Sequence, residues 1–255
     1  MRILPEDLFE KKVLLILKRY SIDVYSYIRR HRTLLQIIFK LENISSAGDP
    51  AQLRKLSAFF LLNEILINEK KRVRTGMGLI LNGYLNSIIF SFAGVNPLIL
   101  TAYARYNKLL YSSLPFGKPG KKALKNFESY ASWIGDSEGM RITFLFYLAG
   151  LGMDINVSDA GVLARVGKGI SVFLHVENEF GDPAFHKGDL FKVGGIQEGM
   201  SANEKLSLIS EDLNRYYKII EDDIDKLSDS DLKLFFLFEI TEQLSEILNI
   251  MSKEY

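Results

Sequence analysis

The sequence predicts an all-α fold, and three observations lead to this prediction. Apolar residues recur at the spacing of helix faces along most of the chain. The period-two alternation of a half-buried strand is nearly absent. Asp49-Pro50 and Asn96-Pro97 each place an N-cap residue before a proline, which is the typical start of a helix.

These signals place about ten helices in one large bundle. The expected helices cover residues 5–20, 23–42, 49–71, 76–94, 97–113, 121–134, 138–152, 158–178, 201–227 and 228–251. Ser158-Asp159 is the expected cap of the eighth, and Ser201 with Glu204 has capping-box spacing. Because the chain shows no linker with a shift in composition and no internal repeat, we expect a single domain over residues 1–255.

Composition excludes several classes of function. The net charge of +1 argues against a dominant basic surface for nucleic acid. The absence of cysteine excludes disulfides, thiolate metal sites and cysteine nucleophiles. The first residues lack the apolar stretch of a secretory signal, so a cytoplasmic location is expected. Walker A and GxSxG motifs are absent, and His31, His175 and His186 form no HExxH pair.

One stretch tests the expectation that the chain has no membrane span. Residues 75–104 carry no formal charge. This stretch is longer than the roughly 20 apolar residues that are needed to cross a bilayer. The stretch nevertheless contains Asn82, Asn86 and the helix start at Asn96-Pro97. We therefore interpret it as two buried core helices and expect no membrane span.

Three segments carry the candidate site. Residues 28–76 contain a basic pair, an apolar helix, a Gly-Asp-Pro turn, an apolar helix with polar residues, and a basic cluster. Residues 141–146 read RITFLF, and residues 172–190 read VFLHVENEFGDPAFHKGDL. In order and spacing, residues 28–195 resemble the trans-isoprenyl diphosphate synthase (polyprenyl synthetase) family, which implies an isoprenoid synthase-like fold. The family's corresponding segments are a GKRLRPLL-like stretch, a DDxxD helix followed by arginines, a KTAxLF segment, and a second aspartate-rich block.

The resemblance implies a set of cations that bind diphosphate. Arg29 and Arg32 match the lysine and arginine that grip isopentenyl diphosphate, and Arg72 matches the first arginine after the DDxxD motif. Arg141 stands for the lysine of KTAxLF, and Lys187 lies in the second block. Most of the basic side of the family's site is therefore kept.

The same resemblance implies that the metal site is degraded. Asn63, Glu64 and Ile67 occupy the positions of the first three aspartates, and Glu177, Asn178 and Glu179 represent the second block. Carboxylates at i, i+1 and i+4 share one helix face and can supply oxygen ligands to Mg²⁺. Such ions neutralise the diphosphate leaving group as its carbon–oxygen bond breaks. Both DDxxD motifs are thus altered, and Mg²⁺ is the implied cofactor only of an active chain.

Three hypotheses about function follow. The first is a non-catalytic or regulatory subunit in isoprenoid biosynthesis, a homodimer or a heteromer with a competent synthase paralogue, that keeps a prenyl diphosphate ligand. The alternative is an active Mg²⁺-dependent prenyltransferase that condenses isopentenyl diphosphate with an allylic diphosphate through an altered metal site. The third is an unrelated helical protein. The resemblance also implies that Ala58 and Phe59 floor a tunnel for the prenyl chain.

Two further patterns are interpreted as structural. The acidic run from Glu221 to Asp225 has i, i+1, i+3 spacing, and it is expected to be a solvated turn at a helix end. Phe235, Phe236 and Phe238 are expected to pack in the core or against a partner.

Overall fold

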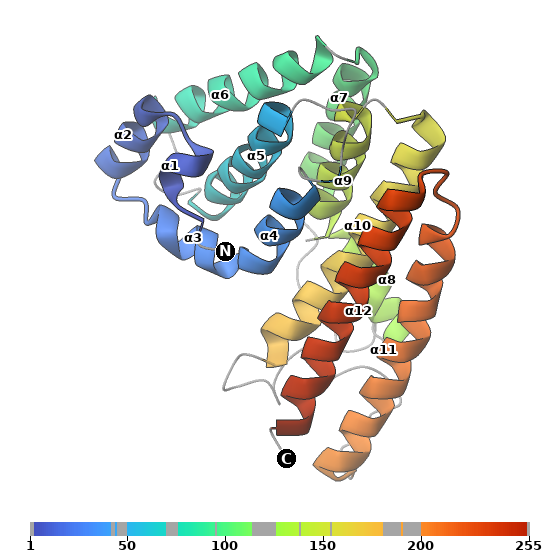
Figure 1. Cartoon of the computed structure of the whole chain (residues 1–255). Coiled ribbons are helices and arrows are strands. Elements are labelled where there is room, and N and C mark those ends of the chain that lie inside the picture. The colour runs from blue at the N-terminus through green and yellow to red at the C-terminus, as the bar shows by residue number, and fades with distance from the viewer. Residues whose placement is uncertain are drawn as a thin grey trace. The chain divides into compact units, whose positions relative to one another are not determined.

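The computed structural model describes residues 3–41, 44, 50–69, 76–94, 96–113, 126–137, 139–153, 155–180, 190 and 200–253. Over these residues every regular element longer than one residue is an α-helix, which confirms the predicted all-α class (Figure 1). The helices are α1 (Pro5–Leu8), α2 (Lys11–Arg19), α3 (Val24–Arg30), α4 (Arg32–Leu41), α5 (Pro50–Asn68), α6 (Gly76–Ala93), α7 (Leu98–Ser113), α8 (Phe127–Asp136), α9 (Met140–Gly152), α10 (Val157–Phe180), α11 (Ala202–Ile224) and α12 (Ser230–Lys253).

The helices form two compact units. Unit 1 comprises Met1–Arg105 and Leu148–Val157, and unit 2 comprises Tyr106–Tyr147 and Ser158–Tyr255. Each unit therefore takes one stretch of chain from within the sequence range of the other. The single domain expected from the sequence stays a prediction.

Side-chain caps start several helices where the sequence places them. Ser201 Oγ accepts a hydrogen bond from the backbone N–H of Glu204, and the Glu204 carboxylate accepts one from the Ser201 N–H, so the predicted capping box of α11 is confirmed. Asn96 Oδ1 accepts from the Leu98 N–H at the start of α7, also as predicted. Asn126 caps α8 through the N–H of Ser129.

Two expected helices are each divided, so those predictions are wrong in detail. The helix expected over residues 5–20 breaks after Leu8, where Phe9 adopts an extended backbone (φ −121°, ψ 139°) and is buried. The helix expected over residues 23–42 breaks at His31 (φ −110°, ψ 23°). The His31 ring packs edge-on against Phe60 of α5, with centroids 5.0 Å apart. At His31 the break thus coincides with a contact to a residue distant in sequence, and helical periodicity does not report such contacts.

The core of unit 1 surrounds α5. This helix packs against α1, α3, α4 and α6. Leu56, Leu61 and Ile65 are fully buried, and every residue from Leu56 to Ile65 is classed as buried. Since α5 is covered on nearly all sides in this stretch, its sequence carries no solvent-facing polar stripe there.

Most residues of α10 are buried in unit 2, and α11 and α12 form a helical hairpin (Figure 1). Phe146 of α9 packs on Phe236 of α12 with ring centroids 5.8 Å apart. Phe236 is fully buried, as predicted, whereas Phe238 is largely exposed. The expected cap role of Asp159 is wrong: α10 begins earlier, at Val157, and Asp159 is buried, where it accepts hydrogen bonds from the backbone N–H and the hydroxyl of Ser228.

The uncharged stretch forms α6 and the first half of α7, and only part of it is buried. Met77, Leu81 and Phe92 of α6 face the core, whereas Leu79 and Phe90 lie on the outside. The expectation of two fully buried helices is therefore wrong for the outer side of α6. Within the described ranges no helix is both long and apolar enough to cross a membrane.

Two glycines of α10 give a matched stability prediction. A Cβ atom added at Gly167 would lie 2.8 Å from the Phe146 side chain, whereas one added at Gly161 would meet no atom within 4 Å. We expect Gly167→Ala to cost about 1–3 kcal/mol through overpacking. Gly161→Ala should gain about 0.5–1 kcal/mol, because glycine is a poor residue for a helix interior.

Thermal unfolding followed by circular dichroism measures both changes, at about 2–4 °C per kcal/mol for a chain of this size. Equal stabilisation by the two substitutions would contradict the close packing of α10 on α9.

Candidate functional site

The first predicted block lies inside unit 1. Asn63 and Glu64 are 8% and 3% exposed on α5. Asn63 Nδ2 donates to the carbonyl oxygen of Phe59, one turn earlier (3.0 Å). Glu64 Oε2 lies 3.6 Å from His31 Nε2 and 3.4 Å from Asn68 Nδ2. Both side chains are thus engaged within their own unit, while Ile67, at the third aspartate position, is only partly buried.

His31 and Tyr27 extend this polar cluster, and neither was singled out as functional from the sequence. The Tyr27 hydroxyl donates to Glu69 Oε1 at 3.3 Å. Burial first, and then the neighbouring Glu69 carboxylate, raise the pKa of Tyr27 to about 12. The i, i+4 spacing of Tyr27 and His31 is visible in the sequence, but it lies in a segment whose most evident feature is its arginines.

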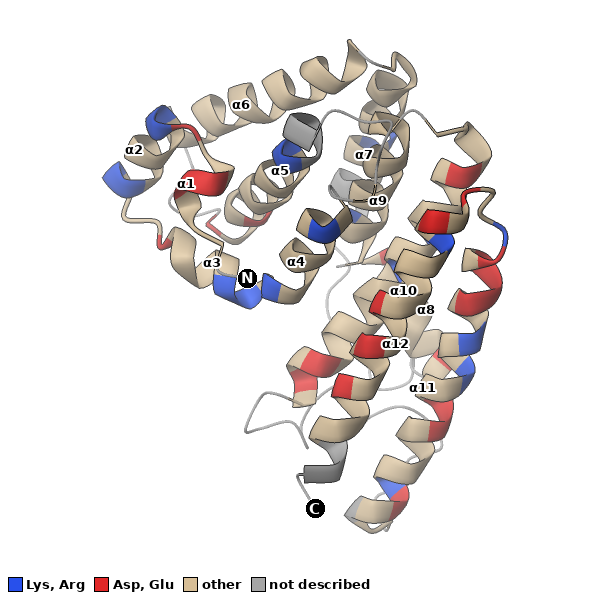
Figure 2. Cartoon of the chain, in the orientation of Figure 1, with Lys and Arg blue, Asp and Glu red and all other residues tan. Residues whose placement is uncertain are grey.

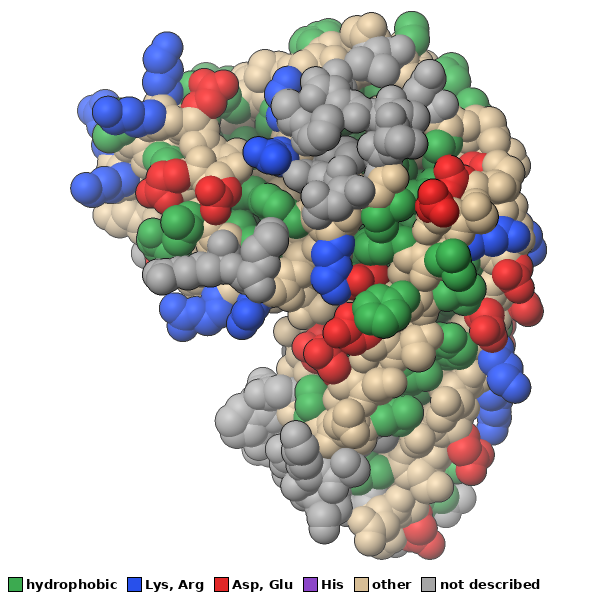
Figure 3. All heavy atoms as spheres, in the orientation of Figure 1, with side chains coloured by type: hydrophobic (Ala, Val, Ile, Leu, Met, Phe, Trp, Pro, Cys, Tyr) green, Lys and Arg blue, Asp and Glu red, His purple; other side chains and the backbone are tan. Residues whose placement is uncertain are grey.

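The predicted cations of unit 1 lie on its surface. Arg29 and Arg30 lie in the last turn of α3 and Arg32 begins α4, and all three are exposed. Basic side chains gather at this corner of unit 1 (Figures 2 and 3). We call Arg29, Arg30 and Arg32 the basic corner. Of the remaining predicted cations, Arg72 and Lys187 lie outside the described residues, and Arg141 is half-buried on α9.

The second predicted block ends α10 in unit 2, and its three residues have different surroundings. Glu179 is engaged on several sides: Oε1 accepts from the Tyr130 hydroxyl (3.3 Å) and lies 3.1 Å from His175 Nε2, while Oε2 accepts from the Leu190 N–H (3.0 Å). Asn178 is exposed and Glu177 is half-buried.

Two aromatic rings contact His175 beside Glu179, and the sequence did not predict these contacts. The rings of Tyr130 and Trp133 on α8 each meet the His175 ring edge-on, with centroids 6.0 Å apart. The i, i+4 pair His175–Glu179 was visible in the sequence, but its partners on α8 are more than 40 residues away. This cluster holds the carboxylate of Glu179 in place by hydrogen bonds and packing.

Glu177 has an unusual environment. Its partial burial raises the pKa of its carboxyl above the usual value, and the charge of Glu246 on α12 raises it further. Its surroundings therefore favour the protonated form.

The described residues contain no group of three or more histidine, aspartate or glutamate side chains that could hold a metal ion. Asn63 and Glu64 belong to unit 1, whereas Glu177, Asn178 and Glu179 belong to unit 2. The acidic run of α11 is at the surface as predicted: Asp222 and Asp225 are exposed, and Asp223 pairs with Arg165 and Lys226 at 2.9 Å each.

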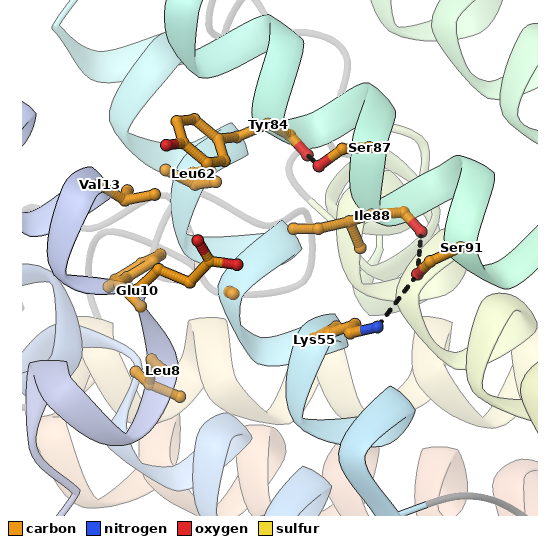
Figure 4. Close-up of a pocket in the computed structure, with 11 residues that line it drawn as sticks. Leu8, Glu10, Val13, Lys55, Leu62, Tyr84, Ser87, Ile88 and Ser91 are labelled. Carbon is orange, nitrogen blue, oxygen red and sulfur yellow. Dashed lines mark hydrogen bonds between the residues drawn. The ribbon is translucent and has the colours of Figure 1, made fainter.

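A cavity of about 280 Å³ opens in unit 1. Its walls are Leu8, Phe9, Glu10 and Val13 from the α1–α2 corner, Lys55, Ala58 and Leu62 from α5, and Tyr84, Ser87, Ile88 and Ser91 from α6 (Figure 4).

The cavity combines apolar walls with a few polar groups at defined places. Lys55 Nζ donates to Ser91 Oγ (3.4 Å) at one end, and the Glu10 carboxylate projects between the helices (Figure 4). Ala58, expected from the resemblance at a tunnel floor, does line this cavity, whereas Phe59 is buried and packs edge-on against Tyr103 at 6.1 Å. The cavity therefore combines apolar walls with one cationic and one anionic side chain.

Comparison with family models, curated proteins and solved structures gives no match for this chain. The resemblance to isoprenyl diphosphate synthases consequently depends on the order and spacing of the motifs.

The raised pKa of Glu177 gives a prediction for stability. Because the folded-state pKa lies above the unfolded value near 4.5, the protonated carboxyl favours folding, and this contribution is lost as the pH rises through the folded pKa. Glu177→Gln keeps the shape and removes the charge. We expect its melting temperature at pH 7 to exceed that of the parent by about 1–2 °C, with the gain vanishing near pH 4.

Glu211→Gln is the control, since Glu211 is exposed and pairs with Arg215 at 3.3 Å on the surface of α11. A gain of the same size from this control, or a gain from Glu177→Gln that grows in acid, would contradict the assigned environment.

Proposed function

We propose that this chain is a non-catalytic relative of the isoprenyl diphosphate synthases that acts as a regulatory subunit beside a competent synthase. In this role it binds a prenyl diphosphate without breaking its carbon–oxygen bond. One observation supports the proposal most directly: the carboxylates of Glu64 and Glu179 make polar contacts and hydrogen bonds within their own units.

The engagement of the carboxylates bears directly on the chemistry. Mg²⁺ requires near-octahedral oxygen ligands, so a ligating carboxylate must turn toward the ion. Turning Glu64 away would break its contacts with the half-buried His31 and with Asn68, which hold this buried carboxylate in place. Without bound metal ions, the charge that develops on a departing diphosphate is not neutralised, and ionisation is not accelerated.

Retained cations support ligand binding in the absence of turnover. The guanidinium groups of Arg29 and Arg32 are exposed and can form bidentate, charge-assisted hydrogen bonds to phosphate oxygens. The cavity beside Ala58 offers apolar walls with Lys55 at its edge. The exposed arginines suit a diphosphate group, and the apolar walls of the cavity suit a short hydrocarbon chain.

The activity assay tests the proposal. The purified chain, incubated with Mg²⁺, isopentenyl diphosphate and dimethylallyl, geranyl or farnesyl diphosphate, is expected to form no prenyl diphosphate of greater chain length, because the described residues contain no carboxylate cage for the metal. Product analysis by mass spectrometry is the measurement. Robust elongation that disappears in Glu64→Ala or Glu177→Ala would overturn the proposal in favour of an active enzyme with an altered metal site.

A binding assay tests whether the chain binds a prenyl diphosphate through its exposed arginines. Calorimetric titration with geranyl diphosphate should show binding that is weakened about tenfold or more in the double variant Arg29→Ala/Arg32→Ala, since each charge-assisted hydrogen bond contributes about 1.5–3 kcal/mol. The control double variant Lys12→Ala/Arg19→Ala removes two exposed charges from α2 and should bind like the parent.

Lys55→Ala, measured in the same way, reports whether the cavity holds the anionic group. Absence of any binding, or equal weakening by the α2 control, would contradict the proposed ligand. Copurification with a coexpressed competent synthase completes the test, because the subunit role requires it.

A further inference from the structure

We propose that the exposed face of α2 binds the surface of a membrane that contains anionic phospholipid. The face consists of four cations around one exposed leucine, and we call it the α2 basic face: Lys11, Lys12, Leu15, Lys18 and Arg19. The inference goes beyond the proposed function and does not depend on it, because it uses none of the residues assigned to the prenyl diphosphate.

The α2 basic face is the whole exposed side of its helix. Its members lie at i, i+1, i+4, i+7 and i+8, which places them on one side of an α-helix with Leu15 in the middle. All five are exposed, and the other four residues of α2 are buried or half-buried. Leu15 is 58% exposed although it is apolar. The helix therefore presents one leucine to solvent in the middle of four cations.

No acidic side chain balances these cations on the helix itself. From Lys11 to Arg19 the chain contains no Asp or Glu, and Figure 2 shows both ends of α2 in blue. The acid that immediately precedes the helix, Glu10, lies on its other side, where it lines the cavity together with Val13. Within the described part of the chain the four cations form no ion pair. Their charge is therefore available to an anionic partner.

The charge of the chain is unevenly divided between its two units. Unit 1 contains 16 Lys and Arg against 9 Asp and Glu, whereas unit 2 contains 16 Lys and Arg against 22 Asp and Glu. The net charge of +1 for the whole chain thus conceals a strongly basic unit. Such an asymmetry is typical of proteins that bind a polyanion, which is either a nucleic acid or a membrane surface.

Leu15 decides between these two polyanions. A nucleic acid offers phosphates to Lys and Arg, but its bases stack on aromatic side chains and not on an aliphatic one. At a membrane surface the headgroup phosphates and the boundary of the hydrocarbon both lie within reach of one helix. Long Lys and Arg side chains can extend to the phosphates while their stems and the leucine contact apolar groups. The arrangement therefore favours a membrane surface.

The expected binding is reversible and depends on salt. Each Lys or Arg close to an anionic leaflet strengthens binding about fivefold, and this attraction fades over roughly 10 Å at 0.1 M salt. The four cations of the α2 basic face together give a preference for anionic over neutral membranes on the order of several hundredfold.

Cosedimentation with vesicles tests the proposal. The full chain is mixed with vesicles of phosphatidylcholine alone or with about 30% phosphatidylserine, at about 0.05 M and 0.5 M NaCl. We expect binding to the anionic vesicles at low salt, and binding weakened about tenfold or more by high salt or by the omission of phosphatidylserine. Absence of binding to the anionic vesicles at low salt, or equal binding to both compositions, would overturn the proposal.

Two quadruple variants with the same loss of charge locate the binding surface. In the first, all four cations of the α2 basic face are replaced: Lys11→Gln/Lys12→Gln/Lys18→Gln/Arg19→Gln. The control removes four exposed cations from α7 and α11: Arg105→Gln/Lys108→Gln/Arg215→Gln/Lys218→Gln.

The first variant should bind anionic vesicles about 100-fold more weakly than the parent, and the control should stay within about threefold of it. Glutamine is a good helix former, so both variants should keep their helical circular dichroism. The smaller change Lys11→Gln/Lys18→Gln should weaken binding about 25-fold and serves if the quadruple variant does not fold. Equal weakening by the α2 variant and the control would overturn the proposal.

Leu15→Ala tests the choice of partner, because it leaves every charge in place. It should weaken binding to anionic vesicles about threefold or more through the loss of buried apolar surface. Binding to single-stranded RNA that is as tight as binding to the vesicles, and that Leu15→Ala leaves unchanged, would overturn the membrane as the partner. The two proposals fail separately: prenyl elongation by a chain that binds vesicles removes the proposed function alone.

Discussion

The proposed role of this protein depends on one constraint, which is the burial of Glu64 in α5. A carboxylate that is 3% exposed must have polar neighbours, and His31 and Asn68 supply them. The backbone leaves the helical conformation at His31, which separates α3 from α4 and places the His31 ring beside Glu64. The same break puts Arg29 and Arg30 at the end of α3 and Arg32 at the start of α4, so the arginines of the basic corner lie on either side of His31.

The carboxylates and the cations of the predicted site consequently differ in their exposure and in their contacts. Glu64 is turned into unit 1, and Glu179 is fixed in unit 2 by Tyr130, His175 and the Leu190 N–H, whereas the arginines of the basic corner face solvent. An enzyme that ionises a diphosphate needs the carboxylates available to metal ions. A protein that only binds one needs the cations, and these are the groups that remain available.

The sequence predicted well what local chemistry controls. Ser201 with Glu204 and Asn96 before Pro97 fix helix starts through bonds within four residues, and both were recognised. The break at His31 and the cluster of Glu179 with Tyr130 were missed, because each depends on partners more than 25 residues away. The outer side of α6 was misjudged for a related reason: the composition of an uncharged apolar helix does not tell whether one side or both sides are buried.

Titration with Mn²⁺ in the presence of inorganic diphosphate, followed by electron paramagnetic resonance of the unbound ion, tests the central claim most directly. Mn²⁺ takes the same oxygen ligands as Mg²⁺ and reports binding without any need for turnover. If Glu64 and Glu179 are held inside their units, the chain will show no Mn²⁺ binding beyond that of diphosphate alone up to roughly 1 mM, a generous limit for a carboxylate site. Binding of two or more Mn²⁺ ions per chain at micromolar concentration, abolished by Glu64→Gln, would contradict the account.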